Sequence, residues 1–401
     1  MKTSSARWVA AWVGLLAAAC GAAAGGEVRF EKVTLDKAFR SEGVAVADVN
    51  RDGKPDVLAG DVWYEAPSWR MHEVLDARAY DPAKDRSRCY LNFACDVNGD
   101  GWVDSVVIGR PGGPCTWLEN PKGKAGRWKQ RGICDSACNE TPLFTDLLGT
   151  GRAVLVFATG GRMVWFAPPG KAGAAWATGA ISGPKAPGTD RYSHGLGVGD
   201  LNGDGRRDVM TTAGWWEAPA DRAKGPWTFR KAKLGAACAD MHAYDVDGDG
   251  DADVISSSAH RYGIWWFERV GAGKGMSFRQ HEICKDFSQT HALRLADLNG
   301  DGLKDLVTGK RYFAHRGKDP GAGEPAVLYW FELRRKAPRN VTFVPHRIDD
   351  NSGVGLQFEV TDLDGDGRLD VVTSNKKGVH AFLQRAPGGR PAGRGAAAGG
   401  A

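Results

Sequence analysis

The sequence predicts an all-β fold built from seven repeats of four strands each, and three observations support this prediction. The pattern Asp-x-Asn/Asp-x-Asp-Gly-x-x-Asp occurs in six intact copies, starting at Asp48, Asp96, Asp200, Asp245, Asp297 and Asp362, and a degenerate copy starts at Asp146. Successive copies start 45 to 65 residues apart, a period typical of repeat architectures. The segments between the copies alternate like strands, and none shows an extended helical period. Seven units of four strands indicate a seven-bladed β-propeller.

Unit four shows the four expected strands most clearly. Residues 195–200 lead into the loop, residues 208–212 leave it, residues 215–219 form an aromatic strand, and residues 227–234 close the unit. Aromatic and β-branched residues, bounded by Gly, Asp and Pro, favour strands at these places. The aromatic strands of the other units fall in residues 63–67, 117–121, 165–169, 265–268, 329–332 and 380–383.

The last unit lacks a fourth strand, because the sequence beyond Gln384 is a tail rich in Gly, Pro and Arg. Residues 28–35 resemble a fourth strand and have no unit of their own to pair with. We expect this N-terminal strand to complete the last blade, which would close the ring and remove an open edge. The propeller then spans residues 28–384, and the tail, residues 386–401, is expected to be disordered.

The N-terminus has the pattern of an export signal. Lys2 and Arg7 precede an apolar stretch, residues 8–19, which is too short to span a bilayer as a helix. We interpret residues 1–19 as a signal peptide and expect a secreted or periplasmic protein that is monomeric. Lipidation of Cys20, which would give an outer-membrane or cell-surface lipoprotein, stays open as the alternative to simple cleavage.

Seven cysteines remain if Cys20 is removed or lipidated, so at least one thiol is unpaired. Cys134 with Cys138, and Cys238 with Cys284, are candidate disulfide pairs because all four lie in segments that connect blades. The other three, Cys89, Cys95 and Cys115, are interpreted as small buried apolar residues.

Composition argues against nucleic-acid binding. The formal net charge is +5, and loss of Lys2 and Arg7 with the signal peptide leaves +3, which is too weak and too dispersed for a polyanion. The sequence also has no nucleophile motif of the form Gly-x-Ser-x-Gly, no phosphate-binding loop and no CxxC pair.

The repeated loop has the chemistry of a cation site. Oxygens at positions 1, 3, 5 and 9 can surround one hard cation, and Gly at position 6 allows the sharp turn. The loops, with Val-Ala-Asp-Val-Asn at 46–50 and Gly-Asp-Leu-Asn-Gly-Asp-Gly at 199–205, resemble the FG-GAP/VCBS repeat family, which includes integrin α-chain propellers. This resemblance implies up to six structural Ca²⁺ ions on one face of the disc.

The implied ligands occupy the same four positions in every intact loop. They are Asp48, Asn50, Asp52 and Asp56; Asp96, Asn98, Asp100 and Asp104; Asp200, Asn202, Asp204 and Asp208; Asp245, Asp247, Asp249 and Asp253; Asp297, Asn299, Asp301 and Asp305; and Asp362, Asp364, Asp366 and Asp370. The degenerate copy, residues 146–154, has lost three of its four ligands and should be metal-free. Metal-free Asx-type turns stay open as the alternative, although unscreened carboxylates would repel one another.

The face opposite the loops carries the candidate functional residues. They lie six positions before the loops, where the chain enters each innermost strand, or in the turns between the second and third strands. The catalytic candidates are His194, His291, Lys310 and Arg311, because His can transfer protons and cations can stabilise an oxyanion. The substrate-binding candidates are Glu42, Tyr90, Glu140, His242, His260, Arg261, Tyr312 and His315. The direction of His242, three positions before its loop, is open, and Lys376 is interpreted as a surface residue.

A second resemblance concerns units four to seven. The runs Gln-Thr-His-Ala-Leu at 289–293, Gly-Lys-Arg-Tyr-Phe-Ala-His at 309–315 and Ala-Val-Leu-Tyr-Trp-Phe-Glu at 326–332 resemble secreted bacterial proteins related to the propeller domain of aldos-2-ulose dehydratase. This resemblance implies elimination from a keto-sugar, in which a His removes the proton next to the carbonyl and Lys310, Arg311 or a metal ion stabilises the enolate.

Two function classes therefore stay open. One is a secreted, calcium-containing propeller that acts on a sugar as a lyase or dehydratase. The other is a non-catalytic propeller that binds an extracellular protein or a polysaccharide.

Overall fold

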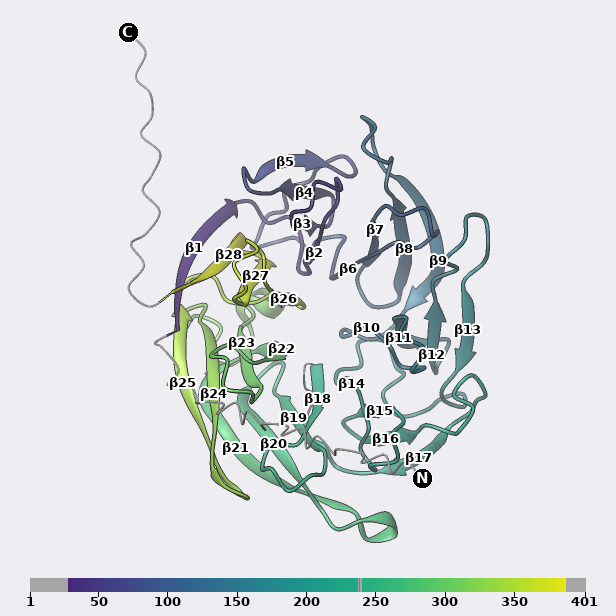
Figure 1. Ribbon diagram of the computed structural model, residues 1–401, viewed down its shortest axis with the longest axis vertical. Coiled ribbons are helices and arrows are strands. Elements are labelled where there is room, and N and C mark those ends of the chain that lie inside the picture. Colours follow the sequence, from purple (N-terminus) through teal and green to yellow (C-terminus); the bar gives the residue numbers. More distant parts are fainter. Residues whose placement is uncertain (1–27, 237, 239, 387–401) are drawn as a thin grey trace, which may run out of the picture.

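The computed structural model describes residues 28–236, 238 and 240–386. These residues form 28 strands, two short 3-10 helices and no α-helix. The strands form antiparallel four-stranded blades around a central axis, so the fold is an all-β β-propeller (Figure 1). No described helix is long and apolar enough to cross a membrane. The predicted signal peptide, Cys20 and all of the predicted tail except Ala386 lie outside the described residues.

Five of the sheets contain four strands each. The first consists of β2 (Ala45–Ala47), β3 (Asp56–Ala59), β4 (Val62–Glu65) and β5 (Arg70–Glu73). The second consists of β6 (Leu91–Cys95), β7 (Asp104–Ile108), β8 (Gly113–Glu119) and β9 (Lys129–Ala137). The third consists of β10 (Leu143–Thr145), β11 (Val154–Thr159), β12 (Arg162–Ala167) and β13 (Ala177–Ala180). The fourth consists of β22 (Thr290–Ala296), β23 (Asp305–Lys310), β24 (Leu328–Ala337) and β25 (Asn340–Asp349). The fifth has the order β1 (Arg29–Asp36), β28 (Gly378–Arg385), β27 (Asp370–Asn375) and β26 (Phe358–Thr361).

The remaining sheet has eight strands. It consists of β14 (Leu196–Gly199), β15 (Asp208–Thr211), β16 (Gly214–Glu217), β17 (Thr228–Lys231), β18 (Asp240–Tyr244), β19 (Asp253–Ser257), β20 (Tyr262–Val270) and β21 (Ser277–Ser288). The expectation of seven separate four-stranded blades is therefore corrected to five, because units four and five share one sheet. The short 3-10 helices are η1 (Gly273–Gly275) and η2 (Ala314–Gly317).

A parallel contact between inner strands joins the two halves of the eight-stranded sheet. β14 and β18 pair through Leu196↔Asp240 and Gly197↔Met241. Gly197 permits this close approach, because a Cβ at this position would lie 2.8 Å from Cγ of Met210 and would also strike the Met241 carbonyl oxygen. Each of the two units thus keeps its four strands, but pairing between their inner strands joins them into one sheet.

The N-terminal strand β1 lies beside the last repeat. It pairs antiparallel with β28 from Arg29↔Arg385 to Asp36↔Val379, with one register shift between Thr34 and Asp36. It supplies the outermost strand of a sheet whose other three strands are β26, β27 and β28. The pairing occupies main-chain groups of β28 that would otherwise form an open edge.

The core lies between neighbouring sheets. One cluster, for example, combines Leu328 and Trp330 from β24 with Phe358 from β26 and Phe382 from β28, all almost fully buried. Because each sheet buries apolar residues against the next, the blades hold one another in place around the axis.

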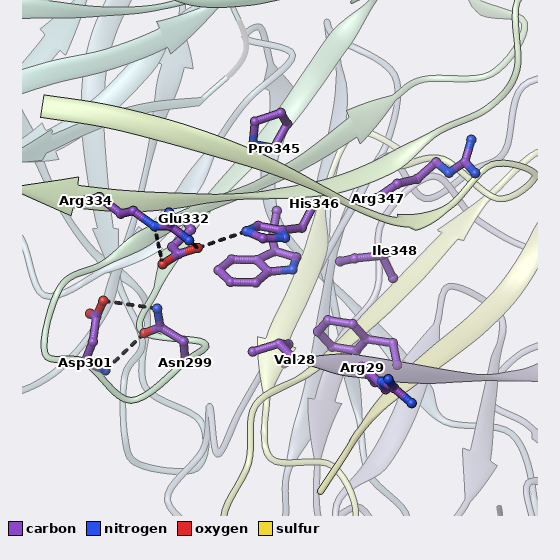
Figure 2. Close-up of a pocket in the computed structure, with 12 residues that line it drawn as sticks. Val28, Arg29, Asn299, Asp301, Glu332, Arg334, Pro345, His346, Arg347 and Ile348 are labelled. Atoms are coloured by element: carbon purple, nitrogen blue, oxygen red, sulfur yellow. Dashed lines mark hydrogen bonds and ion pairs between the residues drawn. The ribbon is translucent and has the colours of Figure 1, made fainter. Parts of the chain in front are cut away.

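The aromatic strands contribute a repeated set of three side chains on the outer part of the blades. The Trp330 ring stacks on His346 with 4.3 Å between ring centroids, and Nε2 of His346 lies 2.9 Å from a carboxylate oxygen of Glu332. Figure 2 shows Glu332 facing His346 and Arg334. The corresponding sets are Trp63, Glu65 and His72; Trp117, Glu119 and Arg131; Trp215, Glu217 and Arg230; and Trp266, Glu268 and His281. These contacts explain why Trp recurs in the third strand.

The expected disulfides are not present, because the seven described cysteines are free thiols. Cys134 lies in β9 and Cys138 directly follows that strand, so about 13 Å of extended chain separates them, beyond the roughly 7 Å that a disulfide allows between Cα atoms. Cys238 precedes β18 and Cys284 lies in β21, at opposite edges of one half of the eight-stranded sheet. Of the three cysteines expected to be buried, Cys89 and Cys115 are buried and Cys95 is half-buried.

Candidate functional site

The repeated loops connect the first and second strands of their units. In the first loop, Asp48 accepts main-chain N–H groups of Asp52 and Gly53 at 3.1 and 3.0 Å. The buried Asp56 accepts those of Val49 and Ala66 at 2.9 and 2.8 Å. The bond from the Gly at position 6 to the first Asp, and two bonds to the last Asp, recur in all six intact loops. The loops are therefore built by the protein's own Asx-type turns.

The position-9 carboxylates stand out electrostatically. Burial, together with the neighbouring carboxylates of the same loop, raises the pKa of Asp104, Asp208, Asp253 and Asp305 to about 7. Ionising these groups close to other carboxylates is unfavourable without a cation nearby. The degenerate loop keeps the turn, since Asp146 accepts the N–H of Gly151 at 3.0 Å, but Val154 replaces the last carboxylate.

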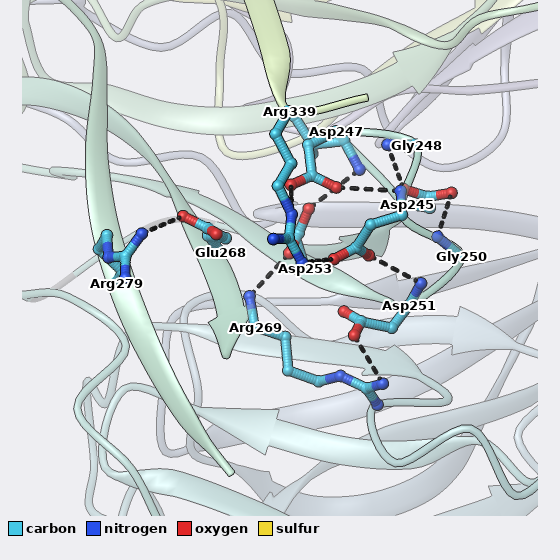
Figure 3. Close-up of polar contacts among 12 residues, drawn as sticks. Asp245, Asp247, Gly248, Gly250, Asp251, Asp253, Glu268, Arg269, Arg279 and Arg339 are labelled. Atoms are coloured by element: carbon cyan, nitrogen blue, oxygen red, sulfur yellow. Dashed lines mark hydrogen bonds and ion pairs between the residues drawn. The ribbon is translucent and has the colours of Figure 1, made fainter. Parts of the chain in front are cut away.

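Two intact loops bring three carboxylates within reach of a single ion. One oxygen from each member lies within 4.8 Å of the others in the sets Asp245, Asp247 and Asp249, and Asp362, Asp364 and Asp370. Arg339, from the turn between β24 and β25, donates to Asp249 at 3.2 Å and lies 3.9 Å from Asp247 (Figure 3). In the described part of the chain, the other four intact loops do not form such a set.

Three histidines and one carboxylate meet at the axial mouth on the opposite side. His194 and His260 come within 2.9 Å of each other at their Nε2 atoms. Oε2 of Glu140 lies 3.2 Å from Nε2 of His291 and 3.5 Å from Nε2 of His194. His194, His260 and His291 each offer one nitrogen within 4.8 Å of the others. Repeat geometry thus brings residues from units three to six to one point.

The second ring nitrogens define the tautomers of this cluster. His194 Nδ1 lies 2.8 Å from the main-chain carbonyl of Tyr192, which can only accept, so this nitrogen carries a hydrogen. His260 Nδ1 lies 3.2 Å from the carboxylate of Asp319 and donates in the same way. In the neutral rings both Nε2 atoms therefore present lone pairs, and these lone pairs face each other.

Glu140 and His291 add further unsatisfied atoms. Oε2 of Glu140 and both ring nitrogens of His291 are buried without a hydrogen-bond partner among the described residues. Burial, with Arg311 nearby, lowers the pKa of His291 to about 3 although Glu140 opposes this shift. Burial would raise the pKa of Glu140, but His194, His291 and Arg311 outweigh it and hold that pKa below its usual range. The cluster therefore combines a charged carboxylate with three imidazole rings that are largely shielded from solvent.

Arg311 links this cluster to the first blade. Its guanidinium lies 2.6 Å from Glu42 and 3.8 Å from Glu140, and burial places all three out of bulk solvent. Tyr90, almost fully buried beside them, has its pKa raised to about 12 by burial and by Glu42, against the opposing effect of Arg311. Arg311 therefore helps to orient the carboxylate of Glu140 toward the histidines.

Four other candidates from the sequence lie around the cluster or away from it. His315 stacks on His260 with 4.6 Å between ring centroids and contacts Asp319 at 3.0 Å. Lys310 is fully buried, and its ammonium contacts Ser288, Gly321 and Glu324; none of its contacts is a histidine. The ring of Tyr312 contacts the ammonium of Lys377. Nε2 of His242 lies 3.0 Å from the Leu293 carbonyl oxygen.

His242 and Arg261 do not join the axial cluster. Burial lowers the pKa of His242 to about 4, and its ring faces the main chain of β22. The side chain of Arg261 is exposed and forms no ion pair among the described residues. The residues that sequence reasoning missed are Asp319, Arg86, Arg316 and, as a site residue, Lys376. Asp319 and Arg316 lie in the insertion of unit six, and Lys376 lies in a repeated turn but was interpreted as a surface residue.

A family model described as an FG-GAP-like repeat matches residues 245–308, a segment that contains the intact loops starting at Asp245 and Asp297. No curated protein matches the chain. The chain also resembles several solved structures at low sequence identity.

One is a structure of an Agrocybe aegerita lectin recognising non-reducing terminal N-acetylglucosamine, with 17% identity, 91% of this chain and 87% of that chain covered, and a TM-score of 0.46. Another is rhamnogalacturonan lyase YesW, with 15% identity, 88% and 75% coverage, and a TM-score of 0.44. A third is BBS1N in complex with ARL6DN, with 12% identity, 89% and 96% coverage, and a TM-score of 0.47.

Proposed function

We propose that the axial mouth holds a divalent transition-metal ion and binds a carbohydrate. The observation that supports this proposal is the convergence of His194, His260 and His291, which each offer one nitrogen within 4.8 Å of the others, with the Glu140 carboxylate beside two of them. Imidazole and carboxylate groups are a common ligand set for zinc, and imidazole also suits iron, nickel and copper. Tyr192 and Asp319 engage the outer nitrogens of two rings, as partners of metal-binding histidines do. We therefore name Zn²⁺ as the ion.

The finer proposal is elimination from a keto-sugar, which the resemblance of units four to seven implies. A bound ion of this kind would supply Lewis acidity toward a carbonyl oxygen. His291 is fully buried, so it suits a ligand role better than the base role expected from the sequence. His315 is exposed, and because its Nδ1 faces Asp319, its Nε2 has a free lone pair.

In this proposal, His315 Nε2 takes the proton from the carbon next to the carbonyl. The released electron pair forms a carbon–carbon double bond and expels the β-oxygen, which takes up the proton now held by His315 and leaves as water or an alcohol. Lys310 acts as a positioning residue, since its contacts with Gly321 and Glu324 hold the insertion that carries His315 and Asp319.

The size of the mouth favours the alternative of binding without catalysis. The cavity above Glu42, Glu140 and Arg311 measures about 20 Å³, which is room for about one water molecule. A sugar ring can enter only if exposed side chains at the rim, such as Arg86 and Arg316, move outward. A saccharide or an extracellular protein held at this rim is therefore the second candidate.

Metal analysis tests the first part of the proposal. Purified protein should contain about one zinc ion that remains after dialysis, and His194→Ala or His260→Ala should lose it. His72→Gln is the matched control, because His72 contacts Glu65 on the outer part of a blade. Equal zinc content in His194→Ala, His260→Ala and wild type would remove the axial metal from the proposal.

The reaction is tested by incubating the zinc-loaded protein with 2-keto and 3-keto sugars and following enone absorbance. His315→Ala should abolish the signal while retaining zinc and the melting temperature. If no keto-sugar reacts but a saccharide binds, the function is the non-catalytic one.

Three further proposals concern the rest of the molecule. The intact loops bind structural Ca²⁺, up to six ions, and the loop at Asp146 binds none. β1 holds the ring closed through β28. The chain is exported, as its first 19 residues indicate.

A further inference from the structure

Cationic side chains surround the axial mouth. Five of its lining residues are cationic, and three are carboxylates: Lys84, Arg86, Arg311, Arg316 and Lys376, against Glu42, Asp85 and Glu140. The cations come from three separate segments: the connection between β5 and β6, the insertion after β23, and the turn between β27 and β28. The ring fold thus brings like charges together at its axis.

The carboxylates at the mouth are already engaged. Glu42 pairs with Arg311, Glu140 faces the histidines, and Asp85 accepts the main-chain N–H of Asp81. The two buried carboxylates therefore leave little negative charge for the cations at the rim, and the third, Asp85, is exposed.

Lys84 pairs with Asp81 at 3.3 Å, but the other cations at the rim have no acidic partner among the described residues. Within the described residues, Arg86 and Arg316 are exposed and form no ion pair or side-chain hydrogen bond. The ammonium of Lys376 contacts the carbonyl and the ring of Phe313. Arg86, Arg311, Arg316 and Lys376 line the same cavity, and burial, with these three guanidinium groups nearby, lowers the pKa of Lys376 although Glu42 opposes this shift.

Backbone geometry holds Arg316 in this position. Phe313, His315 and Arg316 all have positive φ, at 54°, 48° and 58°, a left-handed conformation that such residues rarely adopt. Three such residues among the four from 313 to 316 shape this part of the insertion, where Arg316 and Lys376 line the same cavity.

We propose that the saccharide bound at the axial mouth is anionic and that Arg86, Arg316 and Lys376 receive its oxyanion. The inference rests on the proposed carbohydrate function of the same site. The planar forks of Arg86 and Arg316 match the two oxygens of a carboxylate or of a sulfate ester. An oxyanion between them would relieve the repulsion among the cations, whereas a neutral sugar would leave it unchanged.

The experiment compares three polymers by isothermal titration calorimetry with the zinc-loaded full chain. Polygalacturonate carries carboxylates, its carboxyl-reduced form is the neutral control, and a sulfated galactan carries sulfate esters. The variant is the double substitution Arg86→Gln and Arg316→Gln. Lys318→Gln is the matched control, because Lys318 is an exposed cation on the same insertion that does not line the mouth.

We expect the double variant to weaken binding of one or both anionic polymers about tenfold or more, since charge-assisted hydrogen bonds are lost. Lys318→Gln should bind like wild type, and the two anionic arms decide between carboxylate and sulfate. Equal binding of the reduced polymer and of both anionic polymers would overturn the anionic ligand and leave the carbohydrate function standing. Anionic binding that is unchanged in the double variant would also overturn it. If no saccharide binds, the proposed function itself fails.

Discussion

The charge of Glu140 is the feature on which the axial histidines depend most directly. Its Oε2 is buried without a hydrogen-bond donor and lies between His194, His291 and Arg311. An uncompensated carboxylate in this position would be strongly unfavourable. The neighbouring cations, including the proposed metal ion, therefore account for its presence.

Glu140→Gln should lower zinc affinity about 10- to 100-fold, the range for altered groups in and around metal sites. The amide keeps the shape of the carboxylate and removes its charge. Zinc affinity can be measured by competition with a chelating dye. Glu65→Gln changes the same kind of contact, with His72, on the outer part of a blade and should leave zinc affinity unchanged; an equal effect of both substitutions would contradict the assignment.

Gly197 allows the close contact between β14 and β18. A Cβ at this position would strike Met241 and Met210, so Gly197→Ala should disturb the parallel pairing of β14 with β18. We expect a loss of about 1–3 kcal/mol in the free energy of unfolding, as for overpacked sites, measured by denaturant titration. Gly132→Ala is the control, because a Cβ there meets nothing within 4 Å. Equal stability of the two variants would mean that β14 and β18 tolerate separation.

The strand β1 is the element whose removal should have the largest effect. Deleting residues 28–36 would expose the hydrogen-bonding edge of β28, and exposed edges promote association between chains. We expect a lower melting temperature and aggregates in size-exclusion chromatography. A shortened chain that elutes and melts like the full-length protein would show that β28 needs no partner.

At the scale of the whole molecule, the acidic loops should make stability depend on calcium and on pH together. The pKa values of Asp104, Asp208, Asp253 and Asp305, about 7, lie above the value of about 3.9 expected for unfolded Asp. In calcium-free protein, these groups favour folding when protonated, so their contribution is present below about pH 4 and is lost as pH rises through 7.

Calcium binds the ionised form, so the rise in melting temperature on adding calcium should be larger at pH 8 than at pH 5. Thermal melts with calcium and with chelator at both values check this expectation. Asp249→Ala should lower the number of bound ions by one, and Asp146→Ala should leave it unchanged. A calcium effect of equal size at both pH values would show that the position-9 carboxylates are not ligands.

The sequence predicted what the repeat dictates. The loops, the four strands of a unit, the position of β1 and the convergence of His194 with His291 all follow from a pattern that returns in each unit. Asp319, Arg86 and Arg316 lie in segments that occur once, so no period could place them. Lys310 was expected at the turn between the second and third strands of unit six. Its side chain points away from the histidines because its ammonium contacts Gly321 and Glu324 of the folded insertion.

The fusion of units four and five was hidden for a related reason. It depends on two residue pairs between neighbouring inner strands, and a pattern within one unit carries no information about distances between units. The glycines at 195, 197 and 199 are visible in the sequence. Only the structure shows that they leave room for Met241 and Ala243 of the neighbouring strand.

The register between Arg29 and Arg385 has a consequence for the order of the chain. These residues face each other across β1 and β28, so the two ends of the described fold lie side by side. A short peptide could join them, and new ends could then be opened in a surface connection such as residues 170–176, between β12 and β13. The same ring would be assembled from a rearranged gene, with the axial residues supplied in a different order along the chain.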